Sequence, residues 1–279
     1  MAYKDFTNYR YNPVYTIVGD DKSHFHEKYN LSILYANEGK LFNMKRSYGE
    51  MSQLYYIYQL YKNGTLSSKY VGLNHYRRYF NFLDNIPDLD DIFKNYDLIL
   101  VNAVLKEEGL RNNYCKYHIC EKYDEAMDII KYNKSEYYAT ALKINDIKGI
   151  YFCNMFIMKK EDFMKYCEFI FDILFELDRR NNFKTDKDVL NYVKQIFKKK
   201  KEYEFQSRFH GFLSERLSNI FYHHNFKRIK IFSFSSVKAR NSYCIKEKRI
   251  YKPPEALLIS LIINIIVLFI FFCNNLFLK

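Results

Sequence analysis

The feature that most constrains this chain is an uncharged apolar stretch near its C-terminus. Residues 256–273 read ALLISLIINIIVLFIFFC, and 14 of these 18 residues are Leu, Ile, Val or Phe. At 1.5 Å per residue, a helix over this uncharged stretch just spans a hydrocarbon core of roughly 30 Å. A buried core helix or a terminal strand is the alternative, because Ile, Val and Phe also favour strands. We expect residues 256–278 to form a single transmembrane anchor.

The residues before this stretch support the same interpretation. Pro253 and Pro254 separate the stretch from the preceding chain, and basic side chains come just before them at Lys246, Lys248, Arg249 and Lys252. From residue 181 to residue 254 there are 18 Lys or Arg and 6 Asp or Glu, a difference of +12 that equals the formal net charge of the whole chain. A nucleic-acid binder could carry such a block, but a basic flank beside a membrane helix explains it directly. We therefore expect no nucleic-acid partner, and a cytosolic domain before the anchor.

The N-terminus and the cysteines agree with a cytosolic location. The opening residues MAYKDFTNYRYNP contain no apolar run, so they do not form a signal peptide. The six cysteines include no C-x-x-C pair, and Cys115 and Cys120 lack a second pair that would complete a zinc site. We expect these cysteines to be reduced.

Short apolar runs alternate with segments of helical periodicity along residues 1–235. This alternation is typical of an α/β domain with a mainly parallel sheet flanked by helices. The expected strands are 69–73, 96–104 and 151–158, and the segments 14–19 and 31–36 are expected to be short strands or turns. The expected helices are 48–61, 121–130, 135–142, 161–177, 181–201 and 211–222. The chain then divides into a domain over 1–235, a basic linker over 236–255 and the anchor over 256–278.

The sharpest polar constellation follows the expected strand 69–73. The strand ends in the sequence NHYRRYF, which brings His75, Arg77 and Arg78 to one place. In open α/β sheets ligands bind at the carboxyl ends of strands, and Arg offers planar, permanently charged donors that suit a diphosphate. Surface arginines paired with carboxylates are the alternative. Because side chains alternate along a strand, one of the two arginines faces away from such a ligand if the strand continues.

Two further segments carry candidate polar groups. Arg208, His210, Glu215 and Arg216 surround the start of the expected helix 211–222, and Gly211 would allow a backbone to approach a ligand closely. Asn154, beside Met155, interrupts an otherwise apolar strand. An exposed Glu–Arg pair and a satisfied core Asn are the structural alternatives for these segments.

These segments resemble a known family when they are taken together. YVGLNHYRRYF, YFCNMFIMKKEDFMKYCEFIFDIL and RFHGFLSERLSNIF, in this order, are similar to a family described as a domain of unknown function. Its members lie in capsular and exopolysaccharide biosynthesis clusters and are regarded as glycosyltransferases. The stretch YGEMSQLYYIYQLYKN also looks like the family's E-x-x-x-x-Y-x-x-W-K segment, with Glu50 matching and a tyrosine in the usual Trp position. The resemblance covers roughly residues 13–226.

The resemblance implies a GT-A-like fold with a Rossmann-type sheet that binds a nucleotide sugar. It implies a donor-diphosphate role for His75, Arg77 and Arg78, and a place in the sugar pocket for Asn154 and Met155. The family's R-x-x-G-x-x-x-E-R pattern matches Arg208, Gly211, Glu215 and Arg216, and His210 lies within the same segment. We assign Glu215 and His75 as catalytic candidates, and the other candidates as donor-binding: Arg77, Arg78, Asn154, Met155, Arg208, His210, Gly211 and Arg216.

The sequence leaves metal dependence open. Asp88-Leu-Asp90 is an Asp-x-Asp sequence, but it follows Pro87 and precedes a helix-like run. Acidic residues favour the first turn of a helix, so a helix start is the better interpretation of this segment.

The leading hypothesis is therefore a glycosyltransferase that moves a hexosyl or related sugar from a nucleotide-sugar donor to a lipid-linked or polysaccharide acceptor. The alternative is a membrane-anchored pseudoenzyme or adaptor that keeps the fold without catalysis. This alternative rests on the segment that precedes residues 14–19, which is shorter than the nucleotide-binding unit that family members carry there.

Overall fold

The computed structural model describes residues 17–19, 33–35, 40–75, 78–80 and 87–236. The expected anchor over 256–278, the linker over 236–255 apart from its first residue, and Arg77 lie outside these residues. None of the helices in the described part of the chain is both long and apolar enough to cross a membrane.

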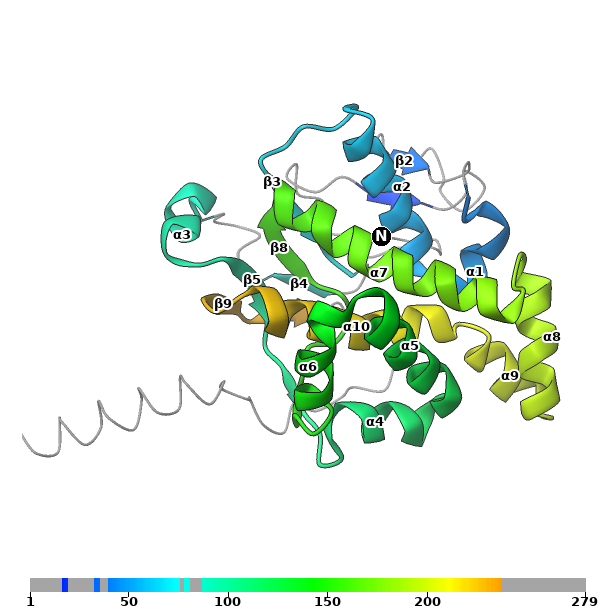
Figure 1. Cartoon of the computed structure of the whole chain (residues 1–279). Helices are drawn as coiled ribbons and strands as arrows, with labels where there is room; N and C mark the ends of the chain where they lie inside the picture. The colour runs from blue at the N-terminus through cyan, green and yellow to red at the C-terminus, as the bar shows by residue number, and fades with distance from the viewer. Residues whose placement is uncertain (1–16, 20–32, 36–39, 76–77, 81–86, 237–279) are drawn as a thin grey trace, which may run out of the picture.

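A four-stranded sheet forms the centre of the fold (Figure 1). Its strands lie in the order β3 (Tyr70–Leu73), β8 (Phe156–Lys159), β5 (Leu98–Val101) and β9 (Ile229–Phe232). The β8 strand is antiparallel to both of its neighbours, whereas β5 and β9 are parallel. The prediction of a mainly parallel sheet was therefore wrong: the sheet is mixed. Apolar runs that are buried on both faces do not reveal strand direction.

The strand directions still bring one set of ends together. Because β8 is antiparallel to β3 and to β5, these two strands run in the same direction, and β9 follows β5. Leu73 at the end of β3 and Leu100 near the end of β5 are both paired with Phe156 at the start of β8. The carboxyl ends of β3, β5 and β9 and the segment that leads into β8 thus share one edge of the sheet.

The two faces of this sheet pack against different cores. Leu73, Leu100 and Phe156 point into the larger core, which is built mainly from helices. Ile99 and Ile157 point into a smaller core that includes residues of α3 (Leu89–Asn95) and of the strand β4 (Arg78–Phe80). Alternation along the strands explains this division, since successive side chains point to opposite faces.

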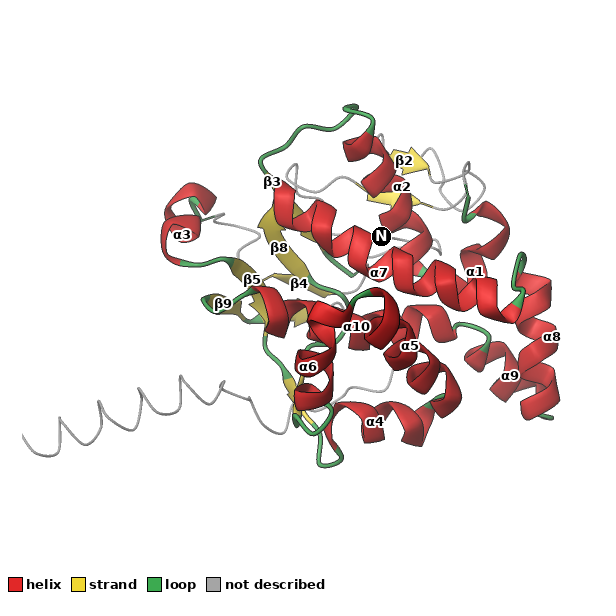
Figure 2. Ribbon diagram, viewed as in Figure 1, coloured by secondary structure: helices red, strands yellow, loops and turns green. Residues whose placement is uncertain are grey.

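The helices gather mainly on the side of the larger core (Figure 2). The longest, α7 (Lys160–Asn181), lies against β3 and β8 and presents a broad apolar face that includes Phe163, Ile170 and Leu174. The other helices are α1 (Lys45–Tyr48), α2 (Glu50–Lys62), α4 (Gly109–Tyr117), α5 (Cys120–Asn133), α6 (Ser135–Ile144), α8 (Asp186–Ile196), α9 (Lys200–Gln206) and α10 (Phe209–Asn225), with a 3-10 turn over Phe42–Met44.

Three small sheets complete the described structure. The strands β1 (Ile17–Gly19) and β2 (Ile33–Tyr35) are parallel. The strand β10 (Phe234–Ser236) pairs with β4, and β6 (Val104–Leu105) pairs with β7 (Gly149–Ile150), both in antiparallel fashion.

One expected helix is broken in the structure. The predicted helix over 181–201 divides into α8 and α9, and Thr185 begins α8 with a capping box in which its hydroxyl and the Asp188 carboxylate satisfy each other's backbone amides. Residues 182–185 separate α7 from α8. Asn182 adopts a left-handed backbone that ends α7, and Thr185 is the N-cap of α8.

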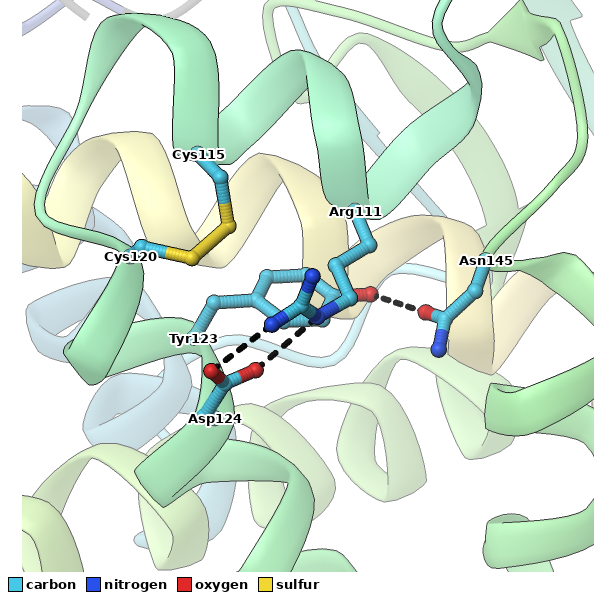
Figure 3. Close-up of a disulfide and its surroundings, with 6 residues drawn as sticks. All are labelled: Arg111, Cys115, Cys120, Tyr123, Asp124 and Asn145. Carbon is cyan, nitrogen blue, oxygen red and sulfur yellow. Dashed lines mark hydrogen bonds and ion pairs between the residues drawn. A yellow bond between two sulfur atoms is a disulfide. The ribbon is translucent and has the colours of Figure 1, made fainter.

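The structure pairs two cysteines that we expected to be reduced. Cys115 at the end of α4 and Cys120 at the start of α5 form a disulfide across a tight turn, with their Cα atoms 4.3 Å apart (Figure 3). Beside this bond, Arg111 of α4 and Asp124 of α5 form a bidentate ion pair. Neither Cys167, which is buried, nor Cys153, at the edge of the sheet where the carboxyl ends gather, takes part in a disulfide.

Candidate functional site

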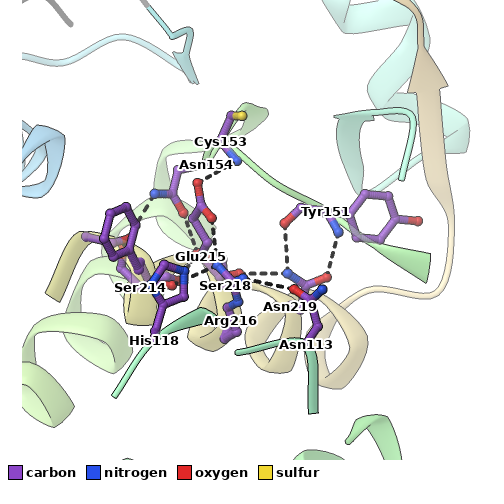
Figure 4. Close-up of polar contacts among 12 residues, drawn as sticks. Asn113, His118, Tyr151, Cys153, Asn154, Ser214, Glu215, Arg216, Ser218 and Asn219 are labelled. Carbon is purple, nitrogen blue, oxygen red and sulfur yellow. Dashed lines mark hydrogen bonds and ion pairs between the residues drawn. The ribbon is translucent and has the colours of Figure 1, made fainter. Parts of the chain in front are cut away.

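Polar side chains from distant parts of the chain meet at the carboxyl edge of the sheet. The segment that leads into β8 supplies Cys153 and Asn154, helix α10 supplies Glu215, and helix α2 supplies Glu50 (Figure 4 shows the α10 and β8 side). Sequence analysis predicted that Asn154 and Glu215 lie in one site. Their groups are connected in the structure, since the Cys153 amide contacts Glu215 and the Asn154 side chain contacts Ser214, one residue before it.

The backbone of this segment adopts a rare conformation. Cys153 has a φ of 71° and Asn154 a φ of 47°, so two consecutive residues other than glycine are left-handed. Such backbones cost about 1–3 kcal/mol each and persist where the surrounding contacts over-determine them, which happens most often at functional sites. The turn places Asn154 inward and leaves the Cys153 amide directed at Glu215.

Asn154 is buried and fully engaged. Its Nδ2 donates to the Glu50 carboxylate at 2.8 Å and lies 3.3 Å from the Ser214 hydroxyl, while its Oδ1 accepts from the Ser218 hydroxyl at 2.9 Å. These contacts fix which end of the amide faces Glu50. Asn154 therefore couples helix α2 to helix α10 through the start of β8.

Both oxygens of Glu215 are held by donors. The Cys153 amide donates to Oε1 at 3.1 Å, and the Arg216 guanidinium donates to Oε2 at 2.8 Å. Burial raises the pKa of Glu215, although Arg216, the Cys153 amide, Arg78 and Arg208 all oppose the rise. Glu215 is thus a fixed carboxylate that clamps the left-handed turn.

Glu50 is a second carboxyl group at this site, and its pKa is clearly raised. It is the first residue of α2, it is partly buried, and burial raises its pKa to about 7 against the effect of the Asn154 hydrogen bond. The charge of Glu215 adds to the rise, and Arg208 opposes it. Sequence analysis noted Glu50 only as a match to a family segment and did not place it in the site. Gly49, which precedes it, has a φ of 56° that favours glycine and begins the helix beside Arg208.

Two predicted arginines lie near these carboxyl groups. Arg78 donates from Nη1 to the Cys153 thiol, and its charge lowers the pKa of Glu215. Arg208 precedes α10, with its guanidinium over the Phe212 ring at 5.7 Å and near Gly49. His75 pairs with Arg78 in a short bridge at the end of β3, so it lies at the same edge.

Other predicted residues lie in the framework behind the site. His210 is completely buried, its Nε2 is 2.7 Å from the Asp178 carboxylate, and its ring stacks on Tyr48. Met155 is buried in the smaller core, on the far face of the sheet. The structure places both as supports of the site rather than at its polar surface.

Arg216 and Gly211 also have defined neighbours within the protein. Arg216 is buried, and besides Glu215 it donates to the Phe212 carbonyl and to the Asn113 side chain. A Cβ on Gly211 would lie 3.3 Å from the Tyr48 carbonyl. The close approach expected at Gly211 is thus made by the backbone of α1, because α10 packs against it here.

Asn219 extends this framework by two contacts that sequence analysis missed. Its Oδ1 accepts from the Tyr151 amide and its Nδ2 donates to the Tyr151 carbonyl, both at 2.9 Å. Since Glu215 and Asn219 are one helical turn apart, a single face of α10 holds the chain that leads into β8. The i, i+4 spacing of these two polar residues was the available signal.

The Asp-x-Asp sequence begins a helix, as expected. Asp88 is the N-cap of α3, and its carboxylate accepts from the amides of Asp90 and Asp91. Within the described ranges, no group of three or more His, Cys, Asp or Glu side chains is arranged to hold a metal ion.

Residues 2–190 match the model of the family described as Domain of unknown function (DUF4422). This chain belongs to the DUF4422 family. The match includes the β3 segment, Glu50 and Asn154, and it ends before α10. The sequence has no match among curated proteins.

The fold of this DUF4422 protein is similar to that of WbbM, a bifunctional glycosyltransferase solved in its apo form. The TM-score is 0.58, and the similarity covers 74% of this chain at 19% sequence identity. It covers 40% of the WbbM chain, so this protein spans less than half of that enzyme. The likeness establishes a mixed α/β fold shared with a glycosyltransferase.

Proposed function

We propose that the protein is a glycosyltransferase that moves a sugar from a nucleotide-sugar donor to a lipid-linked or polysaccharide acceptor. The observation that carries the proposal is the meeting of two carboxyl groups, Glu50 and Glu215, with Arg78 and Arg208 at the carboxyl edge of the sheet. The fold shared with WbbM supports the same class of reaction.

The arginines would stabilise the leaving diphosphate. In glycosyl transfer the bond between the sugar and the diphosphate breaks, and negative charge develops on the diphosphate. Preorganised positive donors lower the barrier when they face the place where that charge appears. Arg78 and Arg208 influence the same carboxyl group, Glu215, from β4 and from the start of α10, so a diphosphate at this edge would lie near both.

Asn154 would shape the donor-sugar pocket from behind, because it is buried and its hydrogen bonds hold Glu50 and helix α10 in place. Its amide is held on both sides by Glu50 and Ser218, and the left-handed turn fixes its backbone. A sugar bound here would meet groups that do not need to reorganise. His75, at the end of β3, would complete the site beside Arg78.

A donor screen with mutants of Arg78 tests the proposal. Purified protein is incubated with nucleotide sugars, and released nucleoside diphosphate is measured. Arg78→Ala should reduce donor binding or turnover about 10- to 100-fold, the equivalent of roughly 1.5–3 kcal/mol for a charge-assisted hydrogen bond. Arg78→Lys should recover part of this loss, because it restores the charge without the planar fork.

Arg228→Ala is a suitable control for this screen. Arg228 pairs with Asp97 at the opposite edge of the sheet, where β5 and β9 begin, and its side chain is 58% exposed. Its removal should leave donor turnover unchanged. If the wild-type protein binds no nucleotide sugar in calorimetry, the pseudoenzyme alternative replaces this proposal.

We also propose that residues 256–278 anchor the enzyme in a membrane, with the domain on the cytosolic side. The support is the 18-residue uncharged stretch and its basic flank. An anchored enzyme would act at the surface that holds a lipid-linked acceptor.

A further inference from the structure

We propose that Glu50, rather than Glu215, accepts the proton of the acceptor hydroxyl during sugar transfer. This inference rests on the proposed function and deepens it, because it names the proton-transfer group of the same site. From the sequence, Glu215 and His75 were the catalytic candidates. The hydrogen bonds of the two carboxyl groups point to Glu50 instead.

Glu215 has little capacity left to accept a proton from a substrate. The Cys153 amide occupies Oε1 and the Arg216 guanidinium occupies Oε2. Arg216 is itself held by the Phe212 carbonyl and by Asn113, so it cannot turn away without losing those bonds. Protonation of Glu215 would break one donor contact and leave a buried arginine without its anion, which is costly in a buried setting.

Glu50 has a different set of contacts. Its Oε1 accepts one hydrogen bond, from Asn154, and no residue in the described ranges donates to its second oxygen. None of the ion pairs between described residues includes Glu50, whereas Glu215 pairs with Arg216. The second oxygen can therefore meet a hydroxyl, while the Asn154 bond keeps the carboxyl group aimed.

The groups around Glu50 come from several elements. Glu50 interacts electrostatically with Glu215 and Tyr222 of α10, with Arg208 just before that helix, and with Tyr166 of α7. Burial and the neighbouring Glu215 raise the pKa of Glu50 to about 7, while Asn154 and Arg208 lower it. A group that titrates near neutral pH accepts a proton readily and releases it again, as a general base requires.

The acceptor hydroxyl gives its proton to the free oxygen of Glu50, and the acceptor oxygen forms a bond to the anomeric carbon of the donor. The bond from that carbon to the diphosphate breaks, and its electron pair leaves with the diphosphate beside Arg78 and Arg208. Glu50 afterwards releases the proton to solvent. Glu215 remains ionised and holds the Cys153–Asn154 turn in place.

The test compares Glu50→Gln with Glu215→Gln in the full chain, using the donor selected by the screen. Glu50→Gln should lower kcat for transfer about 10²- to 10⁴-fold, the range for loss of a general base, while calorimetry shows donor affinity within about threefold of wild type. Because the base acts only when it is ionised, wild-type kcat should rise with pH through about 7 and then level off. This dependence should disappear in Glu50→Gln and persist in Glu215→Gln.

Two further variants separate catalysis from folding. Glu50→Ala leaves a space where formate can take over as the base, so added formate should restore part of the turnover. Asp128→Asn, an exposed carboxyl on α5, is the matched control and should behave as wild type. If Glu50→Gln unfolds, formate rescue of Glu50→Ala decides the assignment.

Several results would overturn the assignment to Glu50. Normal turnover of Glu50→Gln would do so, as would a loss of donor affinity equal to the loss of kcat, which would make Glu50 a donor contact. Loss of the pH dependence in Glu215→Gln alone would return the role to Glu215, and absence of formate rescue would remove it from Glu50. If the wild-type protein turns over no donor, the proposed function itself fails, and that outcome is distinct from an active wild type with an unaffected Glu50→Gln.

Discussion

Asp178 should be one of the most sensitive positions in the protein. Its carboxylate accepts from the Tyr48 hydroxyl at 2.5 Å, and the Nε2 atom of His210 lies 2.7 Å from its other oxygen. Tyr48 and His210 are completely buried, and Asp178 is 7% exposed. One side chain on α7 thus satisfies polar groups of α1 and α10, the two elements that lead into Glu50 and toward Glu215.

The expected loss follows from these contacts. Asp178→Ala leaves two buried polar groups without their partner, and each costs about 1–3 kcal/mol. We therefore expect the free energy of unfolding to fall by about 2–6 kcal/mol. Asp178→Asn keeps one carbonyl oxygen as an acceptor and should lose less. Because Tyr48 is two residues before Glu50, the Ala variant should also lower turnover at temperatures where it is still folded.

Urea unfolding followed by circular dichroism measures the change, and a thermal scan should show a lower Tm by roughly 2–4 °C per kcal/mol. Asp172→Ala on the same helix is the control: its side chain is 58% exposed and pairs with Lys134, so its loss should cost about 0–1 kcal/mol. If Asp178→Ala is no less stable than Asp172→Ala, then Asp178, Tyr48 and His210 do not form the buried network described above.

Three other predictions can be checked with simple variants. Gly109→Ala should destabilise the fold by about 1–3 kcal/mol in urea unfolding, because Gly109 has a φ of 76° and an added Cβ would lie 2.9 Å from the Asn145 carbonyl oxygen. Asn154→Ala removes a hydrogen bond that lowers the pKa of Glu50. The rising limb of kcat against pH should consequently move to higher pH, and a shift to lower pH would contradict the assignment. A chain ending at residue 255 should move from the membrane to the soluble fraction with an unchanged Tm, whereas aggregation would identify 256–279 as part of the core.

The strands and helices that bury an apolar face could be predicted from the sequence. The expected strand 69–73 corresponds to β3, and the expected helices over 48–61 and 161–177 correspond to α2 and α7 within a few residues. Each has a pattern that local chemistry explains, such as the end of α2 at Asn63 before Gly64. The direction of β8 was missed, because a buried strand has the same composition whichever way it runs.

Elements with weaker apolar patterns were not found. The helix α4 begins at Gly109 and contains several polar residues, and the strands β4, β9 and β10 are short. Phe80 of β4 is buried, but the described side chains of β9 are only partly buried. These elements are positioned by their partners: β9 by β5, and β4 by β10. Pairing over distances of more than 100 residues leaves no local signal in a single sequence.

The residues of the candidate site also divide into those with a local sequence signal and those placed by distant contacts. Asn154 and Glu215 became candidates because a polar residue in an apolar strand and a charged pair near a helix start are visible locally. Glu50 was not placed in the site, since its importance depends on contact with Asn154, 104 residues away. The pKa of Glu50 is set by that contact, by burial and by Glu215, none of which can be deduced from the residues around position 50.

This dependence also explains why the chemistry of the site is tied to the packing of its helices. Glu50 and Glu215 both belong to helices, and Asn154 belongs to neither. The left-handed turn at Cys153 and Asn154 is held from α10 by Glu215 and is linked to α2 through Glu50. A shift of α10 against α2 would therefore change the distance between the two carboxyl groups and the strain in the turn together. Because electrostatic coupling between buried charges rises steeply as they approach, a small shift would alter the pKa of Glu50 before it altered the fold.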